Sequence, residues 1–291
     1  MNTNFIIMGL PASGKTTFLA ALWHLVEANE TECRLKLDGC SGDFTYLNMI
    51  AEAWRTFKPV PRTSQIGDKD VTIQLINLET NVSGQAFFPD LAGETFDRQV
   101  EDRVCKPEFI EALSQNWGIL FFINADVKED ALSINEFNAR IPVDVSDATS
   151  TGEGEPAASP PELREWTPRD LPAQVKIVQL LSDLIRPPFA PLKRRIAVLI
   201  SAWDLVREMQ LTPSQWLTAH MPLVDQFLKS NQKYFESQIY GVSAQGVKLE
   251  DDQAIDELAR RSTSQRIQIV GQEMEGNDLT EPLLWLMSVK E

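Results

Sequence analysis

The stretch Gly9-Leu-Pro-Ala-Ser-Gly-Lys-Thr16 decides the fold of this chain. It follows a short apolar run, Phe5 to Met8, and it opens a segment with apolar residues at helical spacing, Lys15 to Ala28. Glycine at the first and sixth places lets successive backbone N–H groups point inward around phosphate oxygens. The helix that follows adds its positive dipole end. The stretch therefore predicts a phosphate-binding loop between a buried strand and a helix.

Each residue of this loop has an expected role in holding a nucleotide and Mg²⁺. Lys15 is expected to place its charge on the β- and γ-phosphates, and so to take part in catalysis. Thr16 is expected to give its hydroxyl to Mg²⁺. The other loop residues expected to contact the nucleotide are Gly9, Ala12, Ser13, Gly14 and Thr17.

A second element, Asp90-Leu-Ala-Gly93-Glu94, follows an expected strand at Gln85 to Pro89. A carboxylate at the tip of a strand beside the phosphate loop can hold Mg²⁺ through water, which is the role expected of Asp90. The N–H of Gly93 can reach the γ-phosphate, so this loop would sense whether that phosphate is present.

Two further elements follow strands and are expected to bind the base. In Ser201-Ala-Trp-Asp204 the carboxylate can accept hydrogen bonds from N1–H and the exocyclic amine of guanine, a pattern that adenine does not offer. In Ser243-Ala244-Gln245 a backbone N–H can meet the guanine O6. Trp203 either lies on the purine ring or belongs to the core, and the sequence leaves both interpretations open.

The motifs quoted so far resemble those of P-loop GTPases, and this resemblance implies a switch threonine, which the sequence defines less closely. Thr63 is expected to take this role and to bind Mg²⁺, because it follows a proline-rich loop and precedes a strand. Thr56 is the competitor, but it falls within an expected helix over 44–57. Arg62 is a candidate arginine finger, and Arg98 is another, although a solvated loop arginine is the plainer interpretation of each.

The rest of the chain alternates strands and helices. The continuous apolar run Gly118 to Asn124 predicts an interior strand, and the alternation in Val71 to Leu78 predicts an antiparallel edge strand. The remaining elements are expected strands at 196–200 and 236–242, a β-like piece at 266–270, and helices at 97–115, 172–186, 213–230, 252–262 and 280–289. This pattern predicts an α/β fold with a doubly wound, mostly parallel sheet.

We expect one domain over residues 1–291, with two insertions. Residues 144–162 are rich in proline, glycine, serine and acid, which predicts a flexible surface segment. Residues 247–278 are expected to be inserted before the last helix.

Taken in order, these motifs resemble those of the translation-factor-related and Ras-like class of P-loop GTPases. The details M-G-L-P-A-S-G-K-T-T-F-L, P-R-T at 61–63 and F-P-D-L-A-G-E are similar to the bacterial double-GTPase subfamily. That resemblance implies a GTPase fold, GTP or GDP with Mg²⁺ as ligands, and an association with conflict and antiviral defence gene clusters. Ala202 departs from the family pattern, which has lysine there, and this weakens the inference of guanine specificity. Glu94 stands where Ras-like members place a glutamine that orients water. The resemblance therefore implies that Glu94 orients or deprotonates water, although its charge also repels the phosphate.

Composition narrows the classes of partner. The 291 residues carry a formal net charge of −15 and a sequence pI near 4.7, which argues against a nucleic-acid or anionic membrane surface. Lys193, Arg194 and Arg195 are expected in a solvated turn before a strand. Three cysteines without a C-x-x-C motif, and no apolar run of ~20 residues, fit a soluble cytoplasmic protein.

The sequence thus predicts a Mg²⁺-dependent GTP-binding and GTP-hydrolysing switch that is slow without a partner. Switch loops near 58–68 and 90–104 would present a surface to a partner protein. The alternatives are a nucleotide-binding scaffold with little or no hydrolysis, or a P-loop kinase or ATPase.

Overall fold

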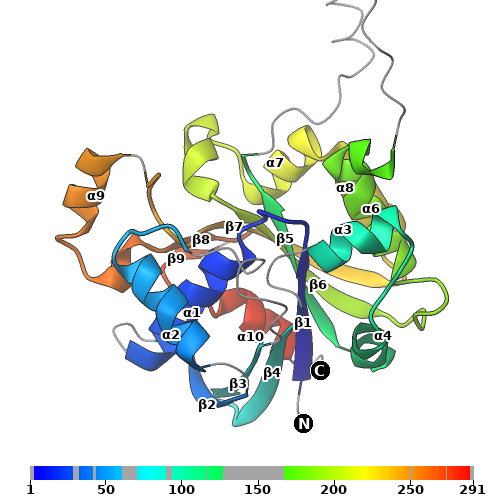
Figure 1. The fold of residues 1–291 in the computed structure, drawn as a ribbon, viewed down its shortest axis with the longest axis horizontal. Helices are drawn as coiled ribbons and strands as arrows, with labels where there is room; N and C mark the ends of the chain where they lie inside the picture. Colours follow the sequence, from blue (N-terminus) through cyan, green and yellow to red (C-terminus); the bar gives the residue numbers. More distant parts are fainter. Residues whose placement is uncertain are drawn as a thin grey trace, which may run out of the picture.

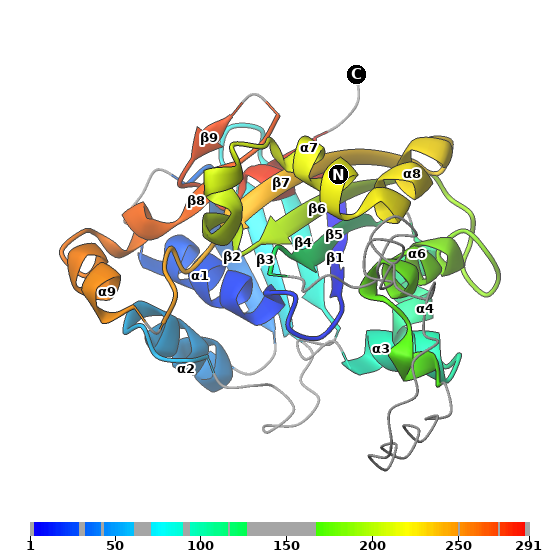
Figure 2. The same ribbon diagram turned by 90° about the horizontal axis from the view of Figure 1, so that it is seen from above.

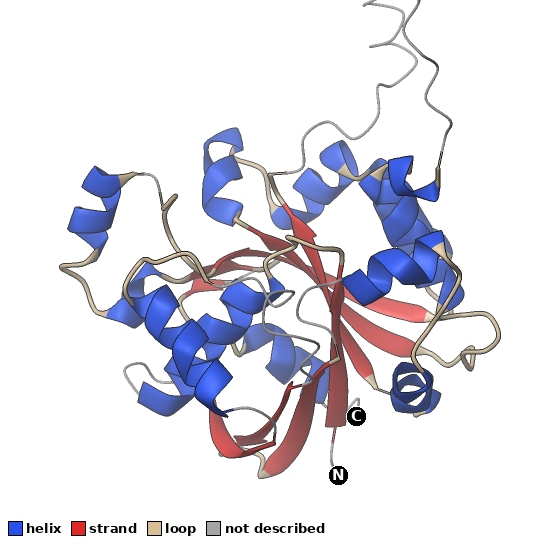
Figure 3. Ribbon diagram, in the orientation of Figure 1, coloured by secondary structure: helices blue, strands red, loops and turns tan. Residues whose placement is uncertain are grey.

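The computed structural model describes residues 3–28, 33–41, 44–60, 71–89, 94–115, 117–126, 167–249, 251–272 and 274–288. Within these ranges one mixed sheet forms the middle of the molecule, and helices cover both of its faces (Figure 3). The strand order is β2-β3-β4-β1-β5-β6-β7-β8-β9.

The middle of the sheet is parallel. Its strands, in spatial order, are β4 (Val82–Phe88), β1 (Thr3–Gly9), β5 (Gly118–Asn124), β6 (Arg194–Ser201) and β7 (Phe235–Ser243). β5 is buried along its length up to its last residue, which confirms the predicted interior strand. Because these strands run in the same direction, their carboxyl ends meet at one edge of the sheet.

Both outer parts of the sheet are antiparallel. β3 (Val71–Asn77) pairs antiparallel with β4, as predicted, but β2 (Leu35–Ser41) lies outside it and is the edge strand. The sequence did not indicate β2, because Asp38-Gly39 is typical of a turn; in the structure the register shifts between Leu37 and Gly39. At the other edge, antiparallel strands β8 (Gln268–Val270) and β9 (Glu275–Gly276) follow β7.

Two helical layers sandwich this sheet (Figures 1 and 2). One face carries α1 (Lys15–Ala28), α2 (Phe44–Arg55) and α10 (Glu281–Met287), and the other carries α3 (Glu94–Glu101), α4 (Pro107–Ser114), α6 (Ala173–Asp183), α7 (Pro213–His220) and α8 (Pro222–Ser230). Alternate residues of β1 enter the two cores: Phe5 and Ile7 pack on one side, Ile6 and Met8 on the other. This confirms the doubly wound α/β class.

Two predicted helices are each divided in the structure. Pro107 begins α4 after Arg103, whose φ is +58°, so the predicted helix 97–115 becomes α3 and α4. Pro222 begins α8 and divides the predicted helix 213–230 in the same way. Proline lacks the N–H that an interior helical position needs, whereas the first turn of a helix tolerates it.

The short elements that remain are η2 (Pro168–Asp170), η3 (Trp203–Met209), α9 (Asp252–Leu258) and η4 (Thr263–Arg266). The segment 247–278, predicted as an insertion, holds α9, η4, β8 and β9, whereas 144–162 lies outside the described residues. No helix among the described residues has the length and apolarity needed to cross a membrane.

The sequence predicts a solvated turn at Lys193, Arg194 and Arg195, and this is wrong for Arg194 and Arg195, which lie in β6. Arg194 lies in β6, is 1% exposed, and donates hydrogen bonds to the carbonyl oxygens of Leu113 near the end of α4 and Leu184 after α6. Arg195 donates to the carbonyl oxygen of Trp285 in α10. Helix C-termini leave carbonyl groups without helical partners, and they attract cations.

Candidate functional site

The predicted phosphate loop joins the end of β1 at Gly9 to the start of α1 at Lys15. Gly9 has φ +152° and Gly14 has φ +91°, a region that side chains rarely adopt. A Cβ atom on Gly14 would lie 2.7 Å from the Cβ of Ser201, and one on Gly9 would lie 2.8 Å from the carbonyl oxygen of Phe122. Both positions therefore need glycine, and the predicted strand–loop–helix is confirmed.

Lys15 holds its ammonium group inside this loop. The side chain is 2% exposed, and Nζ donates to the carbonyl oxygens of Gly9 at 2.8 Å and Leu10 at 2.9 Å. A weaker contact joins Nζ to Ser13 Oγ at 3.3 Å. The loop thus contains a fixed positive charge at the amino end of α1, where an anion is favoured.

Two polar side chains from neighbouring strands hold the loop from outside. Asn124 at the end of β5 donates to the carbonyl oxygen of Ala12 at 2.9 Å, and Ser201 at the end of β6 donates to that of Ser13 at 2.8 Å. Sequence reasoning did not assign a role to Asn124 or to the Ser201 hydroxyl. The available signal was their place in the chain, because Asn124 ends a predicted strand and Ser201 directly follows another.

The two elements predicted to bind the base meet at the same edge of the sheet. The Ser243 hydroxyl, at the end of β7, donates to the Asp204 carboxylate in η3 at 2.6 Å. Ser243 is 1% exposed, and Asp204 is partly buried. Ala202 lies between β6 and η3 in the left-handed region, with φ +53°. The structure thus brings together two side chains that are far apart in the sequence.

Trp203 lies in the core. It is 4% exposed, and its ring covers Gly241 of β7 so closely that a Cβ atom there would lie 2.3 Å from it. Its centroid is 6.5 Å from that of Trp216 in α7. Of the two interpretations left open by the sequence, the structure favours the core one, because the indole already fills the space between β7 and α7.

The structure describes only parts of the two segments that the sequence predicts as switch loops. Thr56 follows α2 and donates its hydroxyl to the carbonyl oxygen of Glu52 at 2.8 Å, and Arg98 on α3 pairs with Asp102 at 3.6 Å. Glu94 is the exposed first residue of α3. Four predicted site residues lie outside the described ranges: Arg62, Thr63, Asp90 and Gly93.

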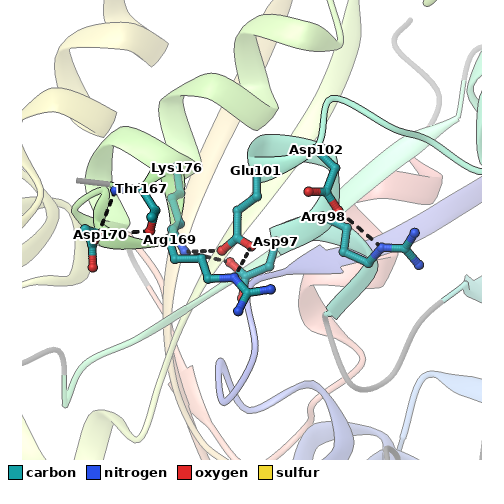
Figure 4. A network of polar contacts seen from close by, with 8 residues as sticks. All are labelled: Asp97, Arg98, Glu101, Asp102, Thr167, Arg169, Asp170 and Lys176. Carbon is teal, nitrogen blue, oxygen red and sulfur yellow. Dashed lines mark hydrogen bonds and ion pairs between the residues drawn. The ribbon is translucent and has the colours of Figure 1, made fainter. Parts of the chain in front are cut away.

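Charged side chains tie α3 to α6 and η2 (Figure 4). Lys176 of α6 reaches Asp97 at 3.1 Å and Glu101 at 3.3 Å, and Arg169 of η2 reaches Glu101 at 3.1 Å. Burial lowers the pKa of Lys176, but the two carboxylates outweigh it, so that the pKa is raised. These ion pairs hold α3, the helix after the second predicted switch loop, against η2 and α6, which follow residues 127–166 in the sequence.

Comparison with known proteins places this arrangement in a family. The family model described as Double-GTPase 1 matches residues 6–286, nearly the whole chain. The chain therefore belongs to the Double-GTPase 1 family, which confirms the subfamily resemblance. No curated protein sequence matches this chain at a significant level.

Solved structures show only a distant likeness in shape. The GTP-bound GTPase-like domain of Ski7 from S. cerevisiae has 13% identity and a TM-score of 0.42, over 84% of this chain and 43% of that one. The bacterial selenocysteine-specific elongation factor EF-Sec has 12% identity and a TM-score of 0.37, over 88% and 28%. A putative nucleolar GTP-binding protein 1 from Plasmodium falciparum has 13% identity and a TM-score of 0.38, over 88% and 91%. This chain spans less than half the length of the first two.

Proposed function

We propose that this Double-GTPase 1 protein binds GTP and GDP at the carboxyl edge of its sheet, hydrolyses GTP, and acts as a switch on a partner protein. The observation that carries the proposal is the convergence of two sites on one edge. The loop that encloses Lys15 and the Asp204–Ser243 pair are joined through β6, whose last residue, Ser201, bonds the loop directly.

The phosphate end of the proposed site fits a polyphosphate. Gly9 and Gly14 take backbone angles that let a loop curl around phosphate oxygens, and the Lys15 ammonium lies inside this loop. Thr16, in the first turn of α1, offers a hydroxyl oxygen of the kind that Mg²⁺ prefers. Asp90 and Thr63 are its proposed companions. When bound, Mg²⁺ neutralises charge that develops on the phosphates.

The base end fits guanine. The Asp204 carboxylate, oriented by the Ser243 hydroxyl, can accept hydrogen bonds from N1–H and the exocyclic amine. The backbone of Ser243, Ala244 and Gln245 follows directly at the end of β7 and can supply an N–H to O6. Adenine would leave the carboxylate without a donor at N1, so it is disfavoured.

For hydrolysis, we propose that Glu94 orients the attacking water and that Lys15 stabilises the phosphate charge. Arg62 and Thr63 complete the arrangement from the first switch loop. Because Glu94 is itself anionic, the rate without a partner is expected to be slow. The proposed setting is the cytoplasm of a bacterium, in a defence system, with segments 58–68 and 90–104 contacting the partner.

The test begins with nucleotide binding by the full chain. Calorimetry with GDP and ADP should show binding of GDP only, and Asp204→Asn should lose GDP and gain xanthosine diphosphate, because an amide can donate to the O2 of xanthine. Asp256→Asn, an exposed carboxylate on α9, is the matched control. Equal affinity of the wild type for GDP and ADP would overturn the guanine assignment.

Phosphate release then separates a switch from a scaffold. A wild-type rate that exceeds that of Lys15→Ala and depends on Mg²⁺ supports the hydrolase. Tight GTP binding without phosphate release, even with a partner, would support the scaffold alternative, which the anionic Glu94 and the unusual Ala202 favour.

A further inference from the structure

Trp54 of α2 contacts the base-recognition loop although it belongs to neither of the motifs described above. Its side chain is fully buried, and its indole N–H donates to the carbonyl oxygen of Ala244 at 2.8 Å. The two residues are separated by 190 positions in the sequence. A long-range side-chain bond of this kind joins α2, on one face of the sheet, to the loop after β7.

This bond fixes one peptide plane of the loop. The carbonyl of Ala244 and the N–H of Gln245 belong to the same planar, trans peptide, so they point in opposite directions. While Trp54 holds the carbonyl, the Gln245 N–H is directed away from α2. Accepting a hydrogen bond at the carbonyl also polarises the N–H of the same peptide and makes it a stronger donor.

Arg266 of η4 holds Trp54 in turn. Its guanidinium lies 4.0 Å from the Trp54 ring centroid and 4.2 Å from that of Phe57. It also donates to the carbonyl oxygens of Trp54 and Arg55, which are the last residues of α2. Stacking and these hydrogen bonds use the planar fork of arginine, which lysine cannot reproduce.

The backbone of Arg266 closes the loop from its other end. Gly246 has φ +83°, and a Cβ atom there would lie 2.5 Å from the Arg266 carbonyl oxygen. The loop 243–246 is thus bonded at Ser243 to Asp204 and at Ala244 to Trp54, and at Gly246 it packs closely against the backbone of Arg266.

We infer that Trp54 and Arg266 are positioning residues for recognition of the base at O6. Together with Phe57 they form what we call the α2 clamp. The inference rests on the proposed guanine function and deepens it. Arg266 belongs to the segment 247–278, whose strands β8 and β9 extend the sheet. The inference gives this segment a second role, in nucleotide binding.

The test uses the full chain and three nucleotides. IDP keeps O6 but lacks the exocyclic amine that Asp204 would bind, and 6-thio-GDP keeps the groups facing Asp204 but replaces O6 with a weakly accepting sulfur. Trp54→Phe removes the indole N–H and keeps an aromatic ring. Trp23→Phe is the matched control, because buried Trp23 also loses one indole hydrogen bond, to Asn48 at 3.0 Å.

Trp54→Phe should lower the preference for GDP over 6-thio-GDP about threefold to tenfold, the effect of one neutral hydrogen bond. Its preference for GDP over IDP should stay at the wild-type value, and Trp23→Phe should alter neither ratio. Arg266→Lys should shift the first ratio in the same direction and by less, and it replaces Trp54→Phe if that variant does not fold.

Loss of affinity for all three nucleotides by the same factor would overturn the positioning role, as would identical behaviour of Trp54→Phe and Trp23→Phe. If the wild type binds none of the three nucleotides, the proposed function fails and the inference fails with it. Wild-type binding with unshifted ratios in the variants overturns the clamp alone.

Discussion

The Ser201 hydroxyl donates a 2.8 Å hydrogen bond to the carbonyl oxygen of Ser13, which lies 188 positions earlier in the sequence. Both residues are buried. Ser201 ends β6 and precedes the Asp204 element, while Ser13 belongs to the loop around Lys15. This hydrogen bond therefore joins the proposed phosphate site directly to the strand that leads into the proposed base site.

Replacing Ser201 with alanine tests this connection. The buried carbonyl of Ser13 would lose a donor, so the free energy of unfolding should fall by about 1–2 kcal/mol. GDP affinity should fall several-fold, because the loop around Lys15 would lose one of its supports. Urea unfolding and calorimetry measure the two effects. Ser114→Ala, which removes an exposed hydroxyl bonded to Glu111 within α4, should leave affinity unchanged.

Gly14→Ala should abolish nucleotide binding. The new Cβ atom would meet Ser201 at 2.7 Å, and φ +91° would be strained for alanine. Gly276→Ala is the control, because a Cβ atom there would meet no atom within 4 Å beyond its chain neighbours, and its φ is not in the strained region. Normal GDP binding by Gly14→Ala would show that the loop does not form the proposed cradle.

Ser243→Ala should lower the free energy of GDP binding by more than it lowers the free energy of unfolding. The Asp204 carboxylate would lose the 2.6 Å bond that orients it, and a bond to a charged group contributes about 1.5–3 kcal/mol. GDP affinity is therefore expected to fall by about tenfold or more. Fluorescence titration of GDP measures this effect. Unchanged affinity would place the base elsewhere.

Lys176→Met should loosen α3. Asp97 and Glu101 would repel each other without the ammonium between them, and stability should fall by about 1–3 kcal/mol. Amide hydrogen exchange should rise in α3 and η2. Because the folded pKa of Lys176 is raised above its ordinary value of 10.5, this contribution is fully present below pH 10.5 and is lost at higher pH. A difference in stability between variant and wild type that changes from pH 7 to pH 9 would contradict the assignment.

Cys105 should react slowly with alkylating agents. Burial, and then the negative charge of Asp183, raise the pKa of its thiol to about 11. At pH 8 the thiolate fraction is therefore about one in a thousand, and alkylation should be on the order of a hundredfold slower than for a free cysteine. Mass spectrometry of iodoacetamide labelling should show a tenfold rise per pH unit from pH 7 to 9.5.

Asp183→Asn should speed this reaction, because it removes the charge that disfavours the thiolate. A labelling rate for the wild type that is half-maximal at pH ~8.5 and level above pH ~9.5 would show that the thiol has an ordinary pKa.

The sequence by itself determined the local parts of this protein. Residues 5–28 form a strand, a loop and a helix because apolar periodicity and the glycine requirement both act within a few residues. The meeting of Asp204 with Ser243 was also predictable, since parallel strands end at one edge of a sheet. Pro107 and Pro222 could have marked the helix boundaries, because proline is tolerated in the first turn of a helix and disfavoured inside it.

Only the tertiary structure decided what depends on distant partners. Trp203 became a core residue because Gly241 of β7 leaves room for its ring, and Arg194 was buried because helix ends offer it carbonyl oxygens. The bonds from Ser201 to Ser13 and from Trp54 to Ala244 join segments nearly 200 positions apart. Such contacts leave no periodic signal, because each is set by how whole elements pack and not by the residues beside it.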